Sequence, residues 1–155
     1  MTAVTVIDRG PGVIARRVTV NAPAGELFAL VNDPRKHGQV DGSGTVRDNV
    51  RGPEQLSQGA KFTTAMKMFG VPYRLTCTVT EHEDTEDRKI IEWEHPAGHR
   101  WRWEFVPTAA GTTEVTESYD GTTSKVGSLL EIVGLAGRNV AGIEQTLEKL
   151  AATYS

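Results

Sequence analysis

The sequence predicts an α+β fold: a curved antiparallel sheet of seven strands wrapped around one long C-terminal helix, with two short helices after the first strand. Two patterns carry this prediction. Apolar and polar residues alternate through much of the segment 44–121, which is the period of half-buried strands. Apolar residues recur at steps of three and four through the segment 128–154, which is the period of an amphipathic helix. A long twisted sheet curves, so its apolar face can enclose such a helix.

The first strand is expected at "GVIARRVTV", residues 12–20. A short helix follows in "NAPAGELFALVNDP", because Pro23 fits a first helical turn, an apolar stripe comes next, and Pro34 stops the helix. Residues 35–44, "RKHGQVDGSG", form a second short helix or an irregular crossing that ends in glycines. The first strand is therefore separated along the chain from the other six.

The alternation predicts six further strands at residues 44–50, 61–69, 73–82, 88–95, 99–106 and 112–121. A two-residue turn at residues 70–71, with glycine first as a type II′ turn prefers, would pair Met68 with Tyr73. The same register would pair Met66 with Leu75. All four side chains would then share one apolar face of the sheet.

The next hairpin brings the three tryptophans together. If the chain turns about Ala97, Trp93 lies opposite Trp101, and Ile91 lies opposite Trp103. The three indole rings would then form one patch.

The long helix is predicted from Ser128 to Tyr154 with a single apolar stripe. Gly134, Gly137 and Gly142 lie within it, and each lowers the local helix propensity. They indicate either a close approach to the sheet or a bend near the middle of the helix.

Composition favours one globular domain spanning residues 1–155, with 38% hydrophobic and 24% charged residues. The net charge of −3 gives no electrostatic reason to expect nucleic acid or an anionic membrane as a partner. Cys77 is the only cysteine, which excludes an internal disulfide and fits a reducing compartment. No bilayer-spanning segment or signal-peptide pattern is present, so the cytoplasm is expected.

The stretch "VTVNAPAGELFALVNDPRKHGQVDGSGTV", the order of elements, and "GTTEVTESYDG" before the last helix resemble the START-like, or SRPBCC, superfamily with its helix-grip fold. The resemblance runs from about Val13 to Leu150 and is greatest to the polyketide cyclase/dehydrase and lipid-transport group. It implies a cavity between the sheet and the long helix in which an apolar small molecule binds. The functions of the superfamily are diverse, so the resemblance alone does not decide the activity.

The predicted inward face independently favours such a pocket, because it is rich in aromatic and methionine side chains. The alternative is that these side chains simply fill the interior, which is the commoner role of each one taken singly. For the set, a ligand-sized cavity is favoured. The residues predicted to contact the ligand are Phe62, Met66, Met68, Tyr73, Leu75, Trp93, Trp101, Trp103, Tyr119 and Ile143.

Glu117 is the most informative single residue, because the alternation places it between Val115 and Tyr119 on the apolar face. An ionised carboxylate there is costly unless it is paired. One interpretation makes Glu117 a general acid/base or a polar anchor for a ligand hydroxyl or carbonyl. The other makes it one half of a salt bridge, for which Arg16 is the candidate partner, or turns it outward at a bulge. Arg17, on the opposite face, is expected to be solvated.

Tyr73 and Tyr119 are candidate hydrogen-bond donors to a substrate carbonyl, although the edge of the core is their commoner role. Cys77 is expected to be a buried, inert thiol. The four histidines show no metal-binding spacing, so neither a metal nor a cofactor is predicted. His37 and Asp41 are fallback polar contacts, because the family layout puts them near the cavity mouth.

Three functions were compared on these residues. Binding of a hydrophobic small molecule (a lipid, a polyketide or an isoprenoid-like compound) is the favoured hypothesis. A cofactor-independent cyclase or dehydratase that uses Glu117 with Tyr73 or Tyr119 is the alternative. A protein-interaction module is the least supported, because the strands place their apolar residues on one face only.

Overall fold

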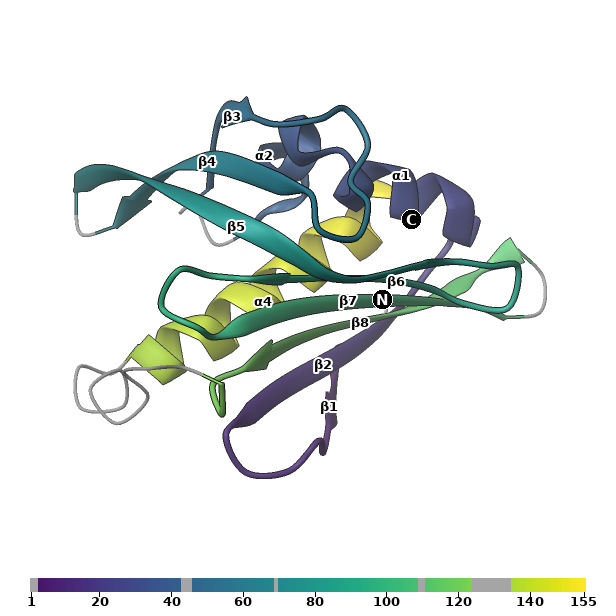
Figure 1. The fold of residues 1–155 in the computed structure, drawn as a ribbon. Coiled ribbons are helices and arrows are strands. Elements are labelled where there is room, and N and C mark those ends of the chain that lie inside the picture. The colour runs from purple at the N-terminus through teal and green to yellow at the C-terminus, as the bar shows by residue number, and fades with distance from the viewer. Residues whose placement is uncertain (1–2, 43–45, 69, 109–110, 124–134) are drawn as a thin grey trace.

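The computed structural model describes residues 3–42, 46–68, 70–108, 111–123 and 135–155 (Figure 1). These residues form an antiparallel sheet with the strand order β1-β2-β8-β7-β6-β5-β4-β3. The strands are β1 (Thr5–Ile7), β2 (Val13–Val20), β3 (Val46–Arg51), β4 (Lys61–Met68), β5 (Val71–Asp84), β6 (Lys89–Glu94), β7 (Arg100–Pro107) and β8 (Thr113–Asp120).

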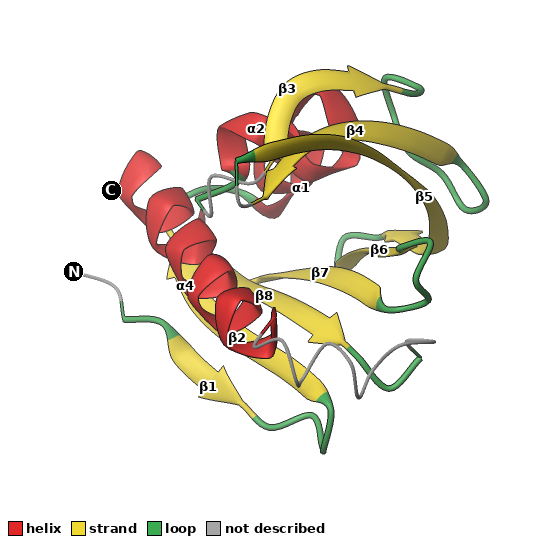
Figure 2. Ribbon diagram, turned by 90° about the vertical axis from the view of Figure 1, so that its left-hand side faces the viewer, coloured by secondary structure: helices red, strands yellow, loops and turns green. Residues whose placement is uncertain are grey.

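The helices lie on the concave side of this sheet. Three short elements connect β2 with β3, which lies at the far edge: α1 (Ala24–Asn32), the 3-10 turn η1 (Pro34–Lys36) and α2 (His37–Val40). The last element, α4 (Leu135–Thr153), packs against β2 and β8. Figure 2 shows the sheet curving around α4, with α1 and α2 beside the strands β3 to β5.

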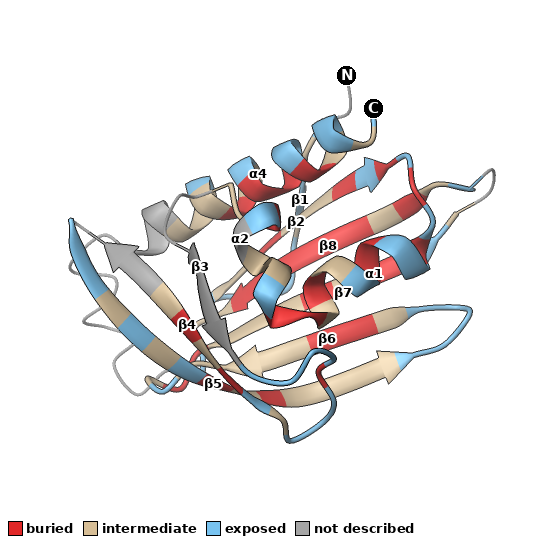
Figure 3. Ribbon diagram, turned by 90° about the horizontal axis from the view of Figure 1, so that it is seen from above, coloured by how far each residue is buried: buried red, intermediate tan, exposed pale blue. Residues whose placement is uncertain are grey.

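The core fills the space between the concave face and the helices. Helix α4 contributes Ile143, Leu147 and Leu150, and α1 contributes Leu27 and Val31. Figure 3 shows the buried positions concentrated along β8, the middle of β6 and β7, and one side of each helix. The sheet supplies the other half of the core, including Val18, Val20, Val79, Ile91, Phe105 and Val115.

The predicted α+β architecture with a helix gripped by a curved sheet is confirmed. All seven predicted strands are present, and a further three-residue strand, β1, pairs with the edge of β2. The long helix is confirmed over residues 135–153, whereas its predicted start at residue 128 lies outside the described residues.

The two predicted hairpin registers had different outcomes. Trp93 pairs with Trp101 and Ile91 with Trp103, as predicted. In the β4–β5 hairpin the register is two residues away from the prediction, because Met66 pairs with Tyr73. A shift of two residues keeps each side chain on its predicted face, because the side-chain period of a strand is two.

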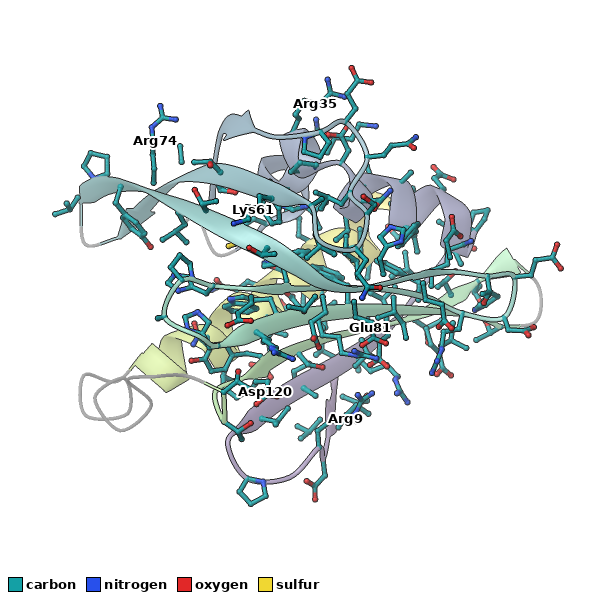
Figure 4. All side chains as sticks on the ribbon, in the orientation of Figure 1. Arg9, Arg35, Lys61, Arg74, Glu81 and Asp120 are labelled. Atoms are coloured by element: carbon teal, nitrogen blue, oxygen red, sulfur yellow. The ribbon has the colours of Figure 1, made fainter. Side chains whose placement is uncertain are left out.

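A register shift between Val79 and Glu81 changes the direction of the side chains at the end of β5. After the shift, His82 turns toward the helices, and its Nε2 lies 2.9 Å from Oδ1 of Asn32 in α1. Glu81 turns to the outer face, where it binds the guanidinium of Arg102. Glu81 is labelled in Figure 4 and belongs to the charged side chains of that outer face.

Candidate functional site

One end of the inner face of β7 and β8 is closely packed. Phe105 of β7 meets Phe28 of α1 edge-to-face, with 6.0 Å between ring centroids. Trp103 stacks on Phe105 at 5.9 Å and an interplanar angle of 7°. All three side chains are buried. This end is a closely packed aromatic core.

A second aromatic group lies beneath α2. The His37 ring stacks on Trp93 with 5.0 Å between centroids, and Phe62 meets both rings edge-on. His37 Nε2 lies 2.6 Å from the carbonyl oxygen of Val31 and donates a hydrogen bond to it. Burial lowers the pKa of His37, so the ring is held neutral. His37 therefore packs α2 onto the sheet, which gives this candidate polar contact a structural role.

Glu117 lies on the inner face of β8, directly opposite Trp103 of β7. Its exposed fraction is 7%, and its Oε1 has no hydrogen-bond partner among the described residues. Burial, with a smaller contribution from the Asp41 carboxylate, raises the pKa of Glu117 well above its usual value. The carboxyl therefore holds its proton at pH values where an exposed glutamate is ionised.

The residue opposite Glu117 on β2 is Arg16, the predicted salt-bridge partner. Its guanidinium instead donates to Oε2 of Glu144 in α4 at 3.2 Å and to the carbonyl of Ala15 at 2.9 Å. The charge of Arg16 is thus directed to the helix rather than to Glu117. Arg17, expected to be solvated, donates a hydrogen bond of 2.8 Å to Oγ1 of Thr116 on the outer face.

The segment after α2 is held against α4 close to Glu117. The Gly42 N–H donates to Oγ1 of Thr146 at 3.0 Å, and Nζ of Lys149 donates to the carbonyl of Asp41 at 3.0 Å. A Cβ on Gly42 would lie 2.5 Å from the carbonyl oxygen of Gln145. Only glycine allows this approach, which brings the carboxylate of Asp41 within electrostatic reach of Glu117.

The opposite end of the inner face carries two histidines from the β6–β7 hairpin. The rings of His95 and His99 stack with 4.1 Å between centroids, and His95 Nδ1 accepts the Ala97 N–H at 2.9 Å. The exposed fraction of His99 is 8%, and its Nδ1 has no partner among the described residues. Burial and the neighbouring His95 lower the pKa of His99 to about 4.

His99 falls in the predicted strand 99–106, but it was not predicted as a site residue, because the histidines were weighed only for metal-binding spacing. Its ring lies 5.0 Å from that of Tyr119, and the Tyr119 ring lies 5.1 Å from that of Trp101. The signal was available in the alternation, since residues 99, 101, 103 and 105 have the same parity. Burial raises the pKa of Tyr119, so its hydroxyl stays protonated as a hydrogen-bond donor.

Tyr73 is not brought to the same place as Glu117. Across the sheet, Tyr119 pairs with Trp101 and Trp101 pairs with Trp93. Trp93 in turn pairs with Val79 of β5. Tyr73 is six residues from Val79, which is about 20 Å along a strand at ~3.3 Å per residue. Of the two proposed tyrosine partners, Tyr119 alone lies beside Glu117.

The other predicted ligand contacts are spread over the inner face. Phe62 and Ile143 are buried in the core, and Leu75, Trp93 and Trp101 are partly buried against it. The side chains of Met66 and Met68 lie outside the described part of the chain. Cys77 is buried, and burial raises the pKa of its thiol to about 12, which leaves it unreactive.

The described residues offer neither a cluster of metal ligands nor a membrane-spanning helix. No group of three or more histidine, cysteine, aspartate or glutamate side chains lies close enough together to hold a metal ion. No described helix has the length and apolar character needed to cross a membrane.

Comparisons with known proteins agree with this fold. The chain is 50% identical over 159 residues to the uncharacterized protein Rv0088 of Mycobacterium tuberculosis, a match that covers 100% of this chain and 70% of that protein. A hypothetical protein from Helicobacter pylori has a TM-score of 0.72 at 13% identity, with coverage of 100% of this chain and 99% of that one. Ginseng major latex-like protein 151 from Panax ginseng has a TM-score of 0.63 at 13% identity, with coverage of 92% and 97%.

At such identities the two solved structures show a shared fold only. The sequence model of one family, described as polyketide cyclase/dehydrase and lipid transport, matches residues 12–155. That match spans β2 to the end of α4, which includes every residue of the inner face described above. The helix-grip chain with the buried Glu117 therefore belongs to the polyketide cyclase/dehydrase and lipid transport family.

Proposed function

We propose that the protein binds a hydrophobic small molecule between the inner face of the sheet and α4. The observation that carries this proposal is Glu117: a carboxyl group buried on an aromatic face, with Oε1 unpaired among the described residues. An unpaired buried polar atom costs about 1–3 kcal/mol, and a ligand hydroxyl or carbonyl would remove that cost. The family supports the same class of ligand: a lipid, a polyketide or an isoprenoid-like molecule.

A cyclase or dehydratase activity without a cofactor is the second candidate. It is favoured by the raised pKa of Glu117, because a protonated carboxyl can give a proton to a substrate oxygen. Tyr119 lies two residues away on the same face and could donate a second hydrogen bond to that oxygen. Turnover would require both groups to reach the same substrate atom.

We further propose that the protein works in the cytoplasm and without nucleic acid. A net charge of −3 supplies no general attraction to phosphates. The single thiol, Cys77, is free and buried, which is compatible with a reducing compartment. Both points would be checked by fractionation of the native source and by nuclease treatment of the purified protein.

Native mass spectrometry of freshly purified protein is the first test of ligand binding. We expect an adduct that denaturing extraction releases as an apolar compound, and that changes the tryptophan emission when it is added back. Glu117→Gln separates the two candidates, because an amide keeps a hydrogen bond but supplies no proton. Retained binding with lost conversion of the extract would identify an enzyme. The binding proposal would fail if no adduct is found and if hydrophobic probes such as ANS leave the emission unchanged.

A further inference from the structure

Two polar atoms on the inner face are left without partners, and they lie at different positions along it. Glu117 and His99 are both more than nine-tenths buried, with exposed fractions of 7% and 8%. Neither Oε1 of Glu117 nor Nδ1 of His99 has a hydrogen-bond partner among the described residues. Native proteins pair nearly all such atoms, so a pair of them on one face points to a molecule that would satisfy both.

The side chains between these two atoms are aromatic. Tyr119 follows Glu117 by two residues on β8, and its ring lies 5.0 Å from His99 and 5.1 Å from Trp101. Trp101 is only partly buried although it belongs to the inner face, so part of its surface is open at this end. A planar molecule packed on Trp101 and Tyr119 would have the two unpaired atoms at its opposite ends. Along the chain, His99 is four residues from Trp103, the residue opposite Glu117, which corresponds to about 13 Å along a strand.

The charges around Glu117 disfavour an anionic ligand. Burial raises the pKa of Glu117, and the carboxylate of Asp41, held against α4, adds to this rise. The nearest arginine on the adjacent strand, Arg16, is engaged by Glu144 and by the carbonyl of Ala15. A carboxylate or phosphate placed here would meet a buried carboxyl group and the Asp41 carboxylate, while the cations Arg16 and Lys149 are engaged by other groups.

We propose that the ligand is an uncharged, planar aromatic molecule with two hydrogen-bonding oxygen functions, one bound by Glu117 and the other by His99, while its rings pack on Trp101 and Tyr119. This inference rests on the proposed function and specifies the ligand class. A protonated Glu117 would donate to a carbonyl or accept from a hydroxyl of the ligand. A neutral His99 would accept from a hydroxyl or donate to a carbonyl, according to its tautomer.

Three probes test the ligand class: a dihydroxyanthraquinone, anthracene as the same ring system without oxygen, and oleate as an anionic alkyl chain. Affinities are measured by tryptophan quenching near neutral pH, where oleate is ionised, with a dihydroxyanthraquinone isomer whose phenols stay uncharged. We expect the dihydroxyanthraquinone to bind most tightly. Oleate binding as tightly or more tightly would overturn the inference and leave the proposed function standing. Failure of all three probes, together with no co-purified adduct, would overturn the proposed function as well.

Variants test the two anchors separately. His99→Phe keeps a ring of similar size against His95 and Tyr119 but removes the nitrogen, and Glu117→Leu removes the carboxyl. Each should weaken dihydroxyanthraquinone binding about tenfold, the value of one lost hydrogen bond, and leave anthracene binding unchanged. Ser118→Ala is the matched control, because Ser118 Oγ is also buried and unpaired but faces away from α4. Circular dichroism first checks that both variants are folded. If His99→Phe and Ser118→Ala then bind the dihydroxyanthraquinone with equal affinity, the inference is overturned.

Discussion

The two ends of the inner face of β7 and β8 are built from similar residues, but they differ in how far their side chains are buried and hydrogen-bonded. At the α1 end, Phe105 stacks on Trp103 and meets Phe28 edge-to-face, and all three are buried. At the hairpin end, Trp101 is partly buried, and His99 keeps an unpaired nitrogen. The first end has the properties of a core that stabilises the fold. The second has those of a surface that is completed by another molecule.

The largest expected difference between the two ends is in the free energy of unfolding that is lost when an aromatic side chain is truncated. Phe105→Ala should lower the free energy of unfolding by about 3–5 kcal/mol, because it leaves a cavity in a filled core. Trp101→Ala should cost at most about 2 kcal/mol, because its side chain already has open surface. Denaturant titration measures both, and the fluorescence probes should show the reverse order for ligand affinity. Equal losses of stability would remove the distinction between the two ends.

The next effect is the acid sensitivity contributed by His99. Its folded pKa of about 4 lies below the ordinary value of 6.5, so the unfolded chain binds more protons between these values. Stability should therefore fall as the pH drops from about 6.5 through about 4, by up to about 3 kcal/mol. His99→Phe should reduce this loss, which denaturant titrations of both proteins across this pH range measure.

Glu117 should act in the opposite direction. Its raised pKa means that the folded state binds more protons than the unfolded state above the ordinary value of 4.5. Stability should decline as the pH rises from that value through the raised pKa, by about 1.4 kcal/mol for each unit of difference. Glu117→Gln should flatten this limb and match the wild type at lower pH. A Gln variant with the wild-type slope would show that the carboxyl is ionised in the folded protein.

The smallest effect on stability and ligand affinity is expected at Ser118. This residue tests whether an unpaired buried polar atom affects binding wherever it lies, or only on the inner face. Its Oγ is unpaired and buried, as is Oε1 of Glu117, but it lies on the outer face beside Arg102. Ser118→Ala should raise stability by at most about 1 kcal/mol and change no ligand affinity. A loss of affinity in this variant would mean that strand geometry, rather than the inner-face polar atoms, controls binding.

The sequence predicts the face of each strand residue more reliably than its neighbours across the sheet. Alternation placed Glu117 and the three tryptophans on the inner face, because a strand has a period of two, although the tryptophans pack in three separate aromatic groups rather than in one patch. It gave a β4–β5 register two residues away from the observed one, and no register between β5 and β6, so Tyr73 was grouped with Glu117 although it lies far along β5. Registers differing by two residues give identical patterns.

The candidate site depends on contacts that local patterns do not contain. Arg16 was a reasonable partner for Glu117, since the two are cross-strand neighbours, but Glu144 of α4 binds it across 128 residues of chain. His99 was overlooked although the predicted strand 99–106 includes it, because the histidines were weighed only as metal ligands. The alternation of that strand places His99 on the same face as Trp101 and Trp103.

The pairing of β2 with β8 also dictates when the protein can fold. The residue partners in this pair, such as Arg17 and Thr116, are about a hundred positions apart, and α4 follows later still. Such distant contacts make folding slow, because a large loop must close before they form. On the ribosome, β2 would have only the three-residue strand β1 as a partner until β8 had emerged. The newly made N-terminal half therefore depends on protection from aggregation until the last strand and helix arrive.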